Sequence, residues 1–197
     1  MRLGIMGGTF DPIHYGHLFI AEEARVICSL DTVLFLPNGN PPHKQEGNVT
    51  PATHRYAMTT IAIAGNPHFQ ISDRELRREG KAYAYDTLTE LHTDTPSAEL
   101  FYITGVDTIA DFMTWFRHED VIQMATFLVA TRPGYDLNAL KTKLPAHYWA
   151  KLEFLTGTHL DISSTELRER VQNGLSIRYL VPDVVNDYIR VNGLYRT

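Results

Sequence analysis

The organisation of this chain is set by one stretch near its start, Gly7-Gly8-Thr9-Phe10-Asp11-Pro12-Ile13-His14-Tyr15-Gly16-His17. The residues before it, Arg2–Met6, predict a buried strand, and the apolar residues after it recur at helical spacing as far as Cys28, which we expect in the core. Two adjacent glycines allow the backbone N–H groups of the turn to face a ligand, because no Cβ stands in the way. The positive end of the helix dipole meets the same point, so the stretch predicts an anion-binding site.

Two histidines stand at the start of this helix. His14 and His17 are three positions apart, so they share one face of the first turn, and Gly16 leaves room between them for a nucleotide. The pattern is neither the GxGxxG dinucleotide fingerprint nor a Walker A loop. Metal ligation by the two histidines, or simple surface exposure, stays open as an alternative, although no HExxH motif accompanies them and neither reading gives the glycines a purpose.

The composition favours one globular domain. Of 197 residues, 44% are hydrophobic and 21% charged, which supports a sizeable core. The net charge of −5 argues against binding nucleic acid or lipid by bulk electrostatics, the single cysteine excludes an internal disulfide, and no apolar run is long enough for a membrane helix. We therefore expect a soluble, cytoplasmic protein with a single domain over 1–197, including a small helical part over about 163–197, that binds neither nucleic acid nor membrane.

Strand and helix patterns alternate along the rest of the chain. Such alternation is typical of parallel strands joined by right-handed crossovers. We therefore expect an α/β fold, a Rossmann-like doubly wound parallel sheet with helices on both faces, with ligands beyond the carboxyl ends of its strands. The expected strands are 32–36, 69–72, 100–104 and 126–131, the expected helices are 51–64, 86–92, 108–113, 119–124, 164–172 and 183–191, and a weaker helix–strand pair is expected in 137–155.

A second motif, Ile162-Ser163-Ser164-Thr165-Glu166-Leu167-Arg168, begins one of the last helices. Ser163 followed three residues later by Glu166 forms a capping box, which requires no further function. Ser164 and Arg168, four positions apart, also share a helical face, and hydroxyls beside a guanidinium suit the phosphates of a nucleotide. Capping and phosphate binding are compatible.

These two motifs resemble a known family. Gly7–His17 is similar to the GGTFDPxHxGH signature, and Ile162–Arg168 to the ISSTxxR motif, of the bacterial nicotinate-nucleotide adenylyltransferases within the nucleotidyltransferase superfamily. The resemblance implies transfer of AMP from ATP to nicotinate mononucleotide, giving deamido-NAD and pyrophosphate, with Mg²⁺ bound to the ATP. It implies that His14, His17 and Arg168 are catalytic. It also implies ATP-binding roles for Gly7, Gly8, Thr9, Gly16, Gly105, Asp107, Ile162, Ser163, Ser164, Thr165 and Arg168.

The acceptor side is implied by the same resemblance. Lys44 belongs to a long loop that matches a phosphate-contacting segment of the family, and Trp115 to a segment that packs around the pyridine ring. Ala84 stands where relatives have a threonine that helps to hold the carboxylate, so the preference for nicotinate over nicotinamide mononucleotide stays open. The residues implied to bind the acceptor are Thr9, Phe10, Lys44, Ala84, Thr87, Trp115, Phe116 and Arg132.

Several alternatives stay open. Asp107 is the only candidate side-chain ligand for Mg²⁺, and N-capping of the following helix explains it equally well. Rival functions are another adenylyltransferase of the superfamily, with nicotinamide mononucleotide or phosphopantetheine as acceptor, a nucleotide-binding module without catalysis, and an RNA-binding fragment related to the synthetases, which the net charge disfavours. The sequence leaves a homo-oligomer open.

Overall fold

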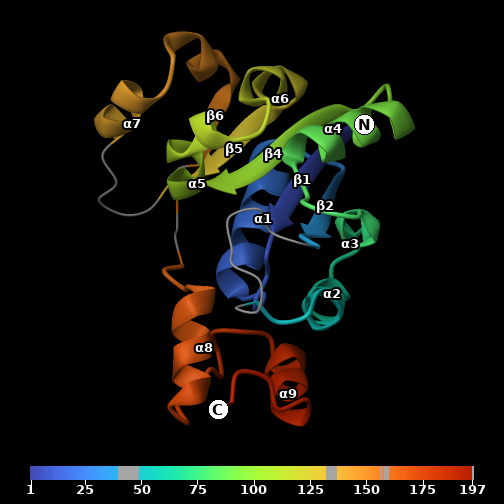
Figure 1. The fold of residues 1–197 in the computed structure, drawn as a ribbon, viewed down its shortest axis with the longest axis vertical. Coiled ribbons are helices and arrows are strands. Elements are labelled where there is room, and N and C mark those ends of the chain that lie inside the picture. Colours follow the sequence, from blue (N-terminus) through green and yellow to red (C-terminus); the bar gives the residue numbers. More distant parts are fainter. Residues whose placement is uncertain (40–48, 132–136, 156, 158–159, 197) are drawn as a thin grey trace.

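The computed structural model describes residues 1–39, 49–131, 137–155, 157 and 160–196 (Figure 1). Within these ranges the strands form one six-stranded sheet in the order β3-β2-β1-β4-β5-β6, and every neighbouring pair is parallel. The expected doubly wound, Rossmann-like α/β fold is confirmed. The strands are β1 (Arg2–Gly8), β2 (Thr32–Pro37), β3 (Phe69–Ile71), β4 (Glu99–Gly105), β5 (Thr126–Ala130) and β6 (Leu152–Leu155).

Helices cover both faces of the sheet. The first face carries α1 (Tyr15–Ile27), α2 (Ala52–Ile63), α8 (Ser164–Gln172) and α9 (Asp183–Val191). The last two helices lie together at one end of the molecule and contribute to the same hydrophobic cluster as α1 (Figure 1). The second face carries α4 (Ala84–Asp94), α5 (Val106–Ala110), α6 (His118–Met124), α7 (Leu137–Lys143) and the 3₁₀ segment η2 (Ala146–Lys151).

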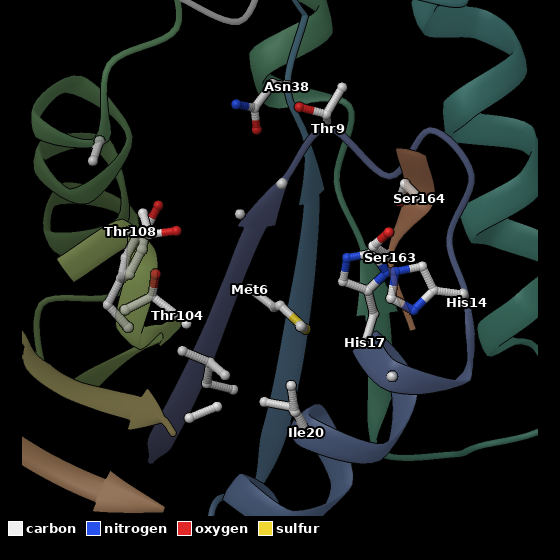
Figure 2. A pocket seen from close by; sticks show the side chains of 18 of the residues that line it. Met6, Thr9, His14, His17, Ile20, Asn38, Thr104, Thr108, Ser163 and Ser164 are labelled. Carbon is white, nitrogen blue, oxygen red and sulfur yellow. The ribbon is translucent and has the colours of Figure 1, made fainter. Parts of the chain in front are cut away.

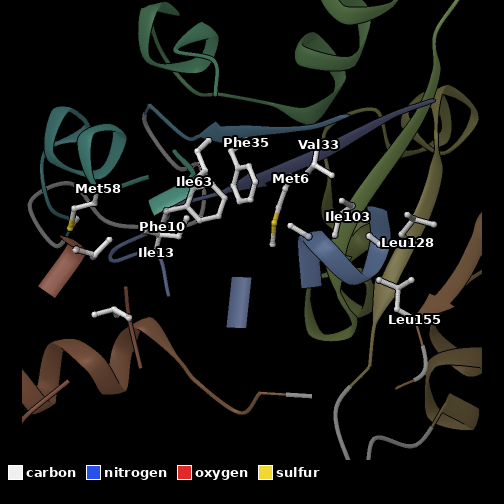
Figure 3. Packing of buried hydrophobic residues seen from close by; sticks show 14 of the residues in the cluster. Met6, Phe10, Ile13, Val33, Phe35, Met58, Ile63, Ile103, Leu128 and Leu155 are labelled. Carbon is white, nitrogen blue, oxygen red and sulfur yellow. The ribbon is translucent and has the colours of Figure 1, made fainter. Parts of the chain in front are cut away.

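The two faces are packed by alternate residues of the strands. On β1, Ile5 faces the cluster under α4 and α5, whereas Met6 faces the cluster under α1 (Figure 3). On β5, Phe127 and Leu128 divide between the clusters in the same way. Successive residues of a strand point to opposite faces of the sheet, so each strand contributes to both clusters. Cys28 is 8% exposed within the first cluster, as expected.

The structure differs from expectation mainly at short elements. A four-residue helix, α3 (Arg74–Arg77), was not expected, because so short a segment carries no periodic pattern. The expected helix at 108–113 is divided into α5 and the 3₁₀ segment η1 (Phe112–Thr114). Gly174 and Gly193 follow α8 and α9 at φ +69° and +62°, the left-handed conformation typical of a residue that ends a helix.

No helix in the described ranges is both long and apolar enough to span a membrane.

Candidate active site

A cavity of about 510 Å³ opens at the carboxyl ends of β1, β4 and β5. In Figure 2, Thr104 and Thr108 lie on one side of it and the two histidines and Ser163 on the other. Site residues expected from the sequence that line this cavity are Gly7, Gly8, Thr9, His14, Gly16, His17, Ala84, Gly105, Trp115, Phe116, Ile162, Ser163 and Ser164.

The two histidines form one unit in the wall of the cavity. The rings of His14 and His17 are stacked, with centroids 3.7 Å apart and an interplanar angle of 24°. The ring of Phe10 packs edge-on against His17 at 5.1 Å, which fixes the second ring from behind. Within the described residues, the buried Nδ1 atoms of both histidines have no hydrogen-bond partner. Buried donors or acceptors without partners are costly, so these nitrogens are available for a ligand.

Burial controls the charge of this pair. It lowers the pKa of His14 from 6.5 to about 4, because the charged ring would lose its hydration. The pKa of His17 is also lowered well below 6.5, first by burial and then by repulsion from His14. Both rings are therefore neutral at pH 7 in the free protein, and each carries one N–H that it can donate.

Backbone N–H groups at the N-terminus of α1 already have hydrogen-bond acceptors within the protein. The Tyr15 N–H donates to the Leu180 carbonyl at 3.1 Å, and the His17 and Leu18 N–H groups donate to the His14 carbonyl at 3.0 and 3.2 Å. Tyr15 and His17 carry two of the N–H groups that a helix start leaves without i→i−4 partners, and both already have acceptors within the protein. An anion here would depend more on the glycine turn and the imidazoles than on the helix end.

Residues of the second motif, at the start of α8, form hydrogen bonds with the first motif. The Ser163 hydroxyl caps α8 by accepting the Glu166 N–H at 3.1 Å, which confirms half of the capping box. The Glu166 carboxylate turns instead to Arg170, at 3.7 Å. Ser164 donates to the Pro12 carbonyl at 2.9 Å, so the start of α8 is joined to the loop that precedes α1.

Arg168, further along α8, contacts the same loop. One of its Nη atoms donates to the Asp11 carbonyl at 2.8 Å and the other to the Thr165 hydroxyl at 3.3 Å. Neither Arg168 nor Thr165 is among the residues that line the cavity. Their expected phosphate contacts therefore require the guanidinium to change partners when a ligand binds, and they stay predictions.

The opposite end of the cavity is aromatic. Trp115 packs against Tyr102 and Phe112, with ring centroids 5.7 and 5.0 Å apart, so it has a structural role and also lines the cavity. Phe116 is 50% exposed and lies 4.8 Å from the ring of Tyr83, and both line the cavity. These flat surfaces suit a planar heteroaromatic ring.

Besides Thr165 and Arg168, five expected site residues do not line the cavity or are not described. Phe10 is 2% exposed, and its ring packs in the core against His17, so an acceptor contact of its side chain is not supported. Thr87 is buried, donates to Glu75 at 2.8 Å and accepts from Arg78 at 3.2 Å, so its hydroxyl is engaged behind the cavity and its expected acceptor contact is not supported. Asp107, in the first turn of α5, is not among the lining residues. Lys44 and Arg132 lie outside the described residues.

Other residues that line the cavity were not expected from the sequence. Asn38 follows β2 and Thr131 follows β5, where a ligand is expected in a parallel sheet, so the ends of these strands could have indicated them. Tyr102 and Thr104 lie within β4, and their orientation depends on the register of the sheet. The missed lining residues are Met6, Ile20, Asn38, Ala82, Tyr83, Tyr102, Ile103, Thr104, Thr108, Thr114, Ala130, Thr131, Leu160 and Asp161.

The residues present offer little to a metal ion by themselves. Asp161 is the only carboxylate among the described lining residues, and the described part of the chain has no group of three or more His, Cys, Asp or Glu that could hold a metal. This donor set suits Mg²⁺ held mainly by phosphate oxygens and water.

Comparisons with known proteins agree with this chemistry. Residues 5–170 match the model of the cytidylyltransferase-like family. A protein of Moorella thermoacetica, named "probable nicotinate-nucleotide adenylyltransferase", is 46% identical over 199 residues, covering 99% of this chain and 92% of the relative. A protein of Corynebacterium kroppenstedtii with the same name is 48% identical over 194 residues, covering 98% and 90%.

A solved structure shares the fold. Plasmodium falciparum nicotinic acid mononucleotide adenylyltransferase complexed with NaAD superposes with a TM-score of 0.82, covering 98% of this chain and 97% of the other, at 22% identity.

Proposed function

Because this chain belongs to the cytidylyltransferase-like family and, within it, to the nicotinate-nucleotide adenylyltransferases, we propose that it transfers the adenylyl group of ATP to the phosphate of nicotinate mononucleotide. The observation that carries the proposal is the single cavity in which the glycine turn, the stacked histidines and the start of α8 face an aromatic end. The products are deamido-NAD and pyrophosphate.

The reaction needs positioning more than it needs a base. An oxygen of the acceptor phosphate, already ionised at neutral pH, attacks the α-phosphorus of ATP, and the bond from that phosphorus to the bridging oxygen breaks to release pyrophosphate. No proton has to be removed from the nucleophile. The protein must hold two anionic molecules in line and stabilise the charge that develops, and a preformed cavity is suited to both tasks.

The glycine turn and the histidines are assigned to the reacting phosphates. Backbone N–H groups at Gly8, Thr9 and Phe10 would orient the phosphates of the two substrates. Each neutral imidazole, His14 and His17, would donate an N–H to the α-phosphate or to the departing pyrophosphate. Binding of the triphosphate raises the pKa of both rings, because a nearby negative charge favours the protonated form.

The start of α8 is assigned to the triphosphate. The hydroxyls of Ser163 and Ser164 line the cavity, and Arg168 lies one turn further along the helix. We propose that its guanidinium leaves the Asp11 carbonyl for the β- and γ-phosphates when ATP binds. Mg²⁺ bound to the triphosphate neutralises part of its charge. Asp107 stays a prediction as a contact of the ribose or the metal.

The aromatic end is assigned to the acceptor. Trp115 and Phe116 offer faces for the pyridine ring, and Ala82 and Ala84 leave room beside it. Ala84 brings no hydroxyl to the carboxylate of the acceptor. The backbone N–H groups at the start of α4 are the remaining donors that could favour nicotinate over nicotinamide.

Comparing acceptors tests the proposal. Purified protein is mixed with ATP, Mg²⁺ and one of three acceptors, nicotinate mononucleotide, nicotinamide mononucleotide or phosphopantetheine, and pyrophosphate release is measured. We expect the fastest release with nicotinate mononucleotide. Faster release with phosphopantetheine would overturn the choice of acceptor, and ATP binding without release for any acceptor would favour a non-catalytic module.

A further inference from the structure

Arg55 on α2 has an arrangement that the proposed mechanism does not use. Its side chain is 1% exposed, although it carries a guanidinium. Burial lowers the pKa of Arg55, and the charge of Asp11 counters part of that effect. Arginine is rarely buried unless all its donors are engaged, because a buried cation without partners is strongly destabilising.

Each nitrogen of this guanidinium reaches a backbone carbonyl. Nε donates to the carbonyl of Thr50 at 2.8 Å, one Nη to that of Thr9 at 2.8 Å and the other Nη to that of Gly39 at 3.1 Å. Thr9 belongs to the glycine turn, and Gly39 follows Asn38 beyond β2; both Thr9 and Asn38 line the cavity. Thr50 precedes α2. One rigid, planar group therefore joins three separate segments, two of which border the cavity.

Asp11 links Thr50 to Tyr195 near the C-terminus. Its buried carboxylate accepts the N–H of Thr50 at 3.2 Å and the hydroxyl of Tyr195 at 2.7 Å. Thr50 is thus held at its N–H by Asp11 and at its carbonyl by Arg55. The Asp11 carbonyl in turn accepts the guanidinium of Arg168. The glycine turn is therefore fixed through Thr9 by Arg55, and the loop that follows it is held by Tyr195 and, before ATP binds, also by Arg168.

We propose that Arg55 is a positioning residue for adenylyl transfer. It holds the Thr9 carbonyl, and with it the orientation of the neighbouring backbone N–H groups, at the place where the reacting phosphates bind. This inference rests on the proposed function, since it assigns those N–H groups to substrate phosphate. Arg55 itself touches no substrate; it acts through Thr9 and Gly39. A displacement of about 1 Å in such a group can lower the rate by about a hundredfold.

The test is a kinetic comparison of Arg55→Lys with the wild type. Lysine keeps the charge but cannot donate to three carbonyls in one plane. We expect kcat to fall by about tenfold to a hundredfold, with the KM values for ATP and for nicotinate mononucleotide changed by less than about threefold, because positioning acts on the transition state more than on substrate binding. A folded Arg55→Lys protein with kcat within about twofold of the wild type would overturn the inference.

Thr59→Val is the matched control on the same helix. The Thr59 hydroxyl is fully buried and donates to the Arg55 carbonyl at 2.8 Å, so its loss weakens α2 without touching the guanidinium. We expect a lower midpoint of thermal unfolding and a kcat within about twofold of the wild type. If Thr59→Val lowers kcat as much as Arg55→Lys does, the effect comes from loosening α2 in general, and the inference fails.

A measurement on the wild type remains decisive if Arg55→Lys does not fold. NMR of protein labelled with ¹⁵N-arginine reports the Arg55 Nε–H directly. We expect this signal to be protected from solvent exchange and to shift when ATP is added without acceptor, because two of the three segments that the guanidinium joins border the cavity assigned to ATP. An unchanged signal at saturating ATP overturns the inference. Absence of pyrophosphate release by the wild type would contradict the proposed function instead, and the two failures are thereby distinguished.

Discussion

Gly16 leaves space for the ring of His14. A Cβ on residue 16 would lie 2.9 Å from Nδ1 and 3.0 Å from Cε1 of His14, and 3.4 Å from the carbonyl oxygen of Leu160. From the sequence, Gly16 is expected to leave room for a nucleotide to approach closely. The structure adds a second reason, because the stacked pair of histidines could not keep its geometry beside a larger residue.

Gly16→Ala should therefore damage catalysis more than folding. Alanine is preferred to glycine in a helix by about 1 kcal/mol, which offsets part of the steric cost. The added methyl group must move the His14 ring, so we expect kcat to fall by about tenfold or more, measured as pyrophosphate release, with a small change in unfolding midpoint. Gly65→Ala is the control, because a Cβ there meets nothing within 4 Å. Equal kcat values for the two variants would contradict this explanation.

His17→Ala should separate catalytic from structural contributions. Removing one charge-stabilising donor from a preorganised site costs about 3 kcal/mol of barrier, so kcat should fall by about a hundredfold or more. The lost packing against Phe10 is offset in part because an unpartnered buried nitrogen is removed as well. We expect the midpoint of thermal unfolding to change little. His92→Ala, which removes a ring bonded to the Met124 carbonyl outside the cavity, should keep its kcat; retention of kcat by His17→Ala would argue against its catalytic role.

The low pKa of His14 predicts acid sensitivity. In the unfolded chain this ring takes up a proton near pH 6.5, whereas in the folded protein it does so only at about pH 4. The stability that it contributes is therefore present above pH 6.5 and is lost as pH falls from 6.5 to about 4. The full loss is about 3 kcal/mol.

Urea unfolding at several pH values measures this loss. Between pH 7 and pH 4, the wild type should lose more free energy of unfolding than His14→Gln does. An NMR titration that gives His14 a pKa near 6.5 would refute the premise.

Local patterns explain why much of the fold could be predicted. The glycine turn, the apolar face of α1 and the Ser163 cap are each encoded within one or two turns of chain, and the structure has all three. The alternation of short apolar strands with helices similarly indicated a parallel sheet with both faces covered.

The rest of the site depends on contacts between distant segments. Tyr102 and Asp161 reach the cavity because the strand order and the segment before α8 place them there, and no local pattern reports either. Arg55 lies on a helix where an arginine would ordinarily be read as solvated, yet it is buried. Thr87 was assigned to the acceptor by the resemblance, whereas in the structure its hydroxyl donates to Glu75 on α3, a helix that was not expected.

The buried carboxyl of Glu75 makes the stability of the protein depend on pH. Burial raises the pKa of this carboxyl to about 7, and the Thr87 hydroxyl and the charge of Arg78 only partly counter the shift, while Glu90 adds to it. A raised pKa means that the folded protein holds a proton which the unfolded chain releases near pH 4.5. The stability that Glu75 contributes is therefore fully present below pH 4.5 and is lost as pH rises through about 7.

Glu75→Gln should remove this dependence, because glutamine is neutral at every pH and can still accept from Thr87. Between pH 4.5 and pH 8.5, the variant should gain about 3 kcal/mol of unfolding free energy relative to the wild type. Urea unfolding at both pH values measures the difference, and parallel curves for the wild type and Glu75→Gln would show that folding does not raise the pKa of this carboxyl.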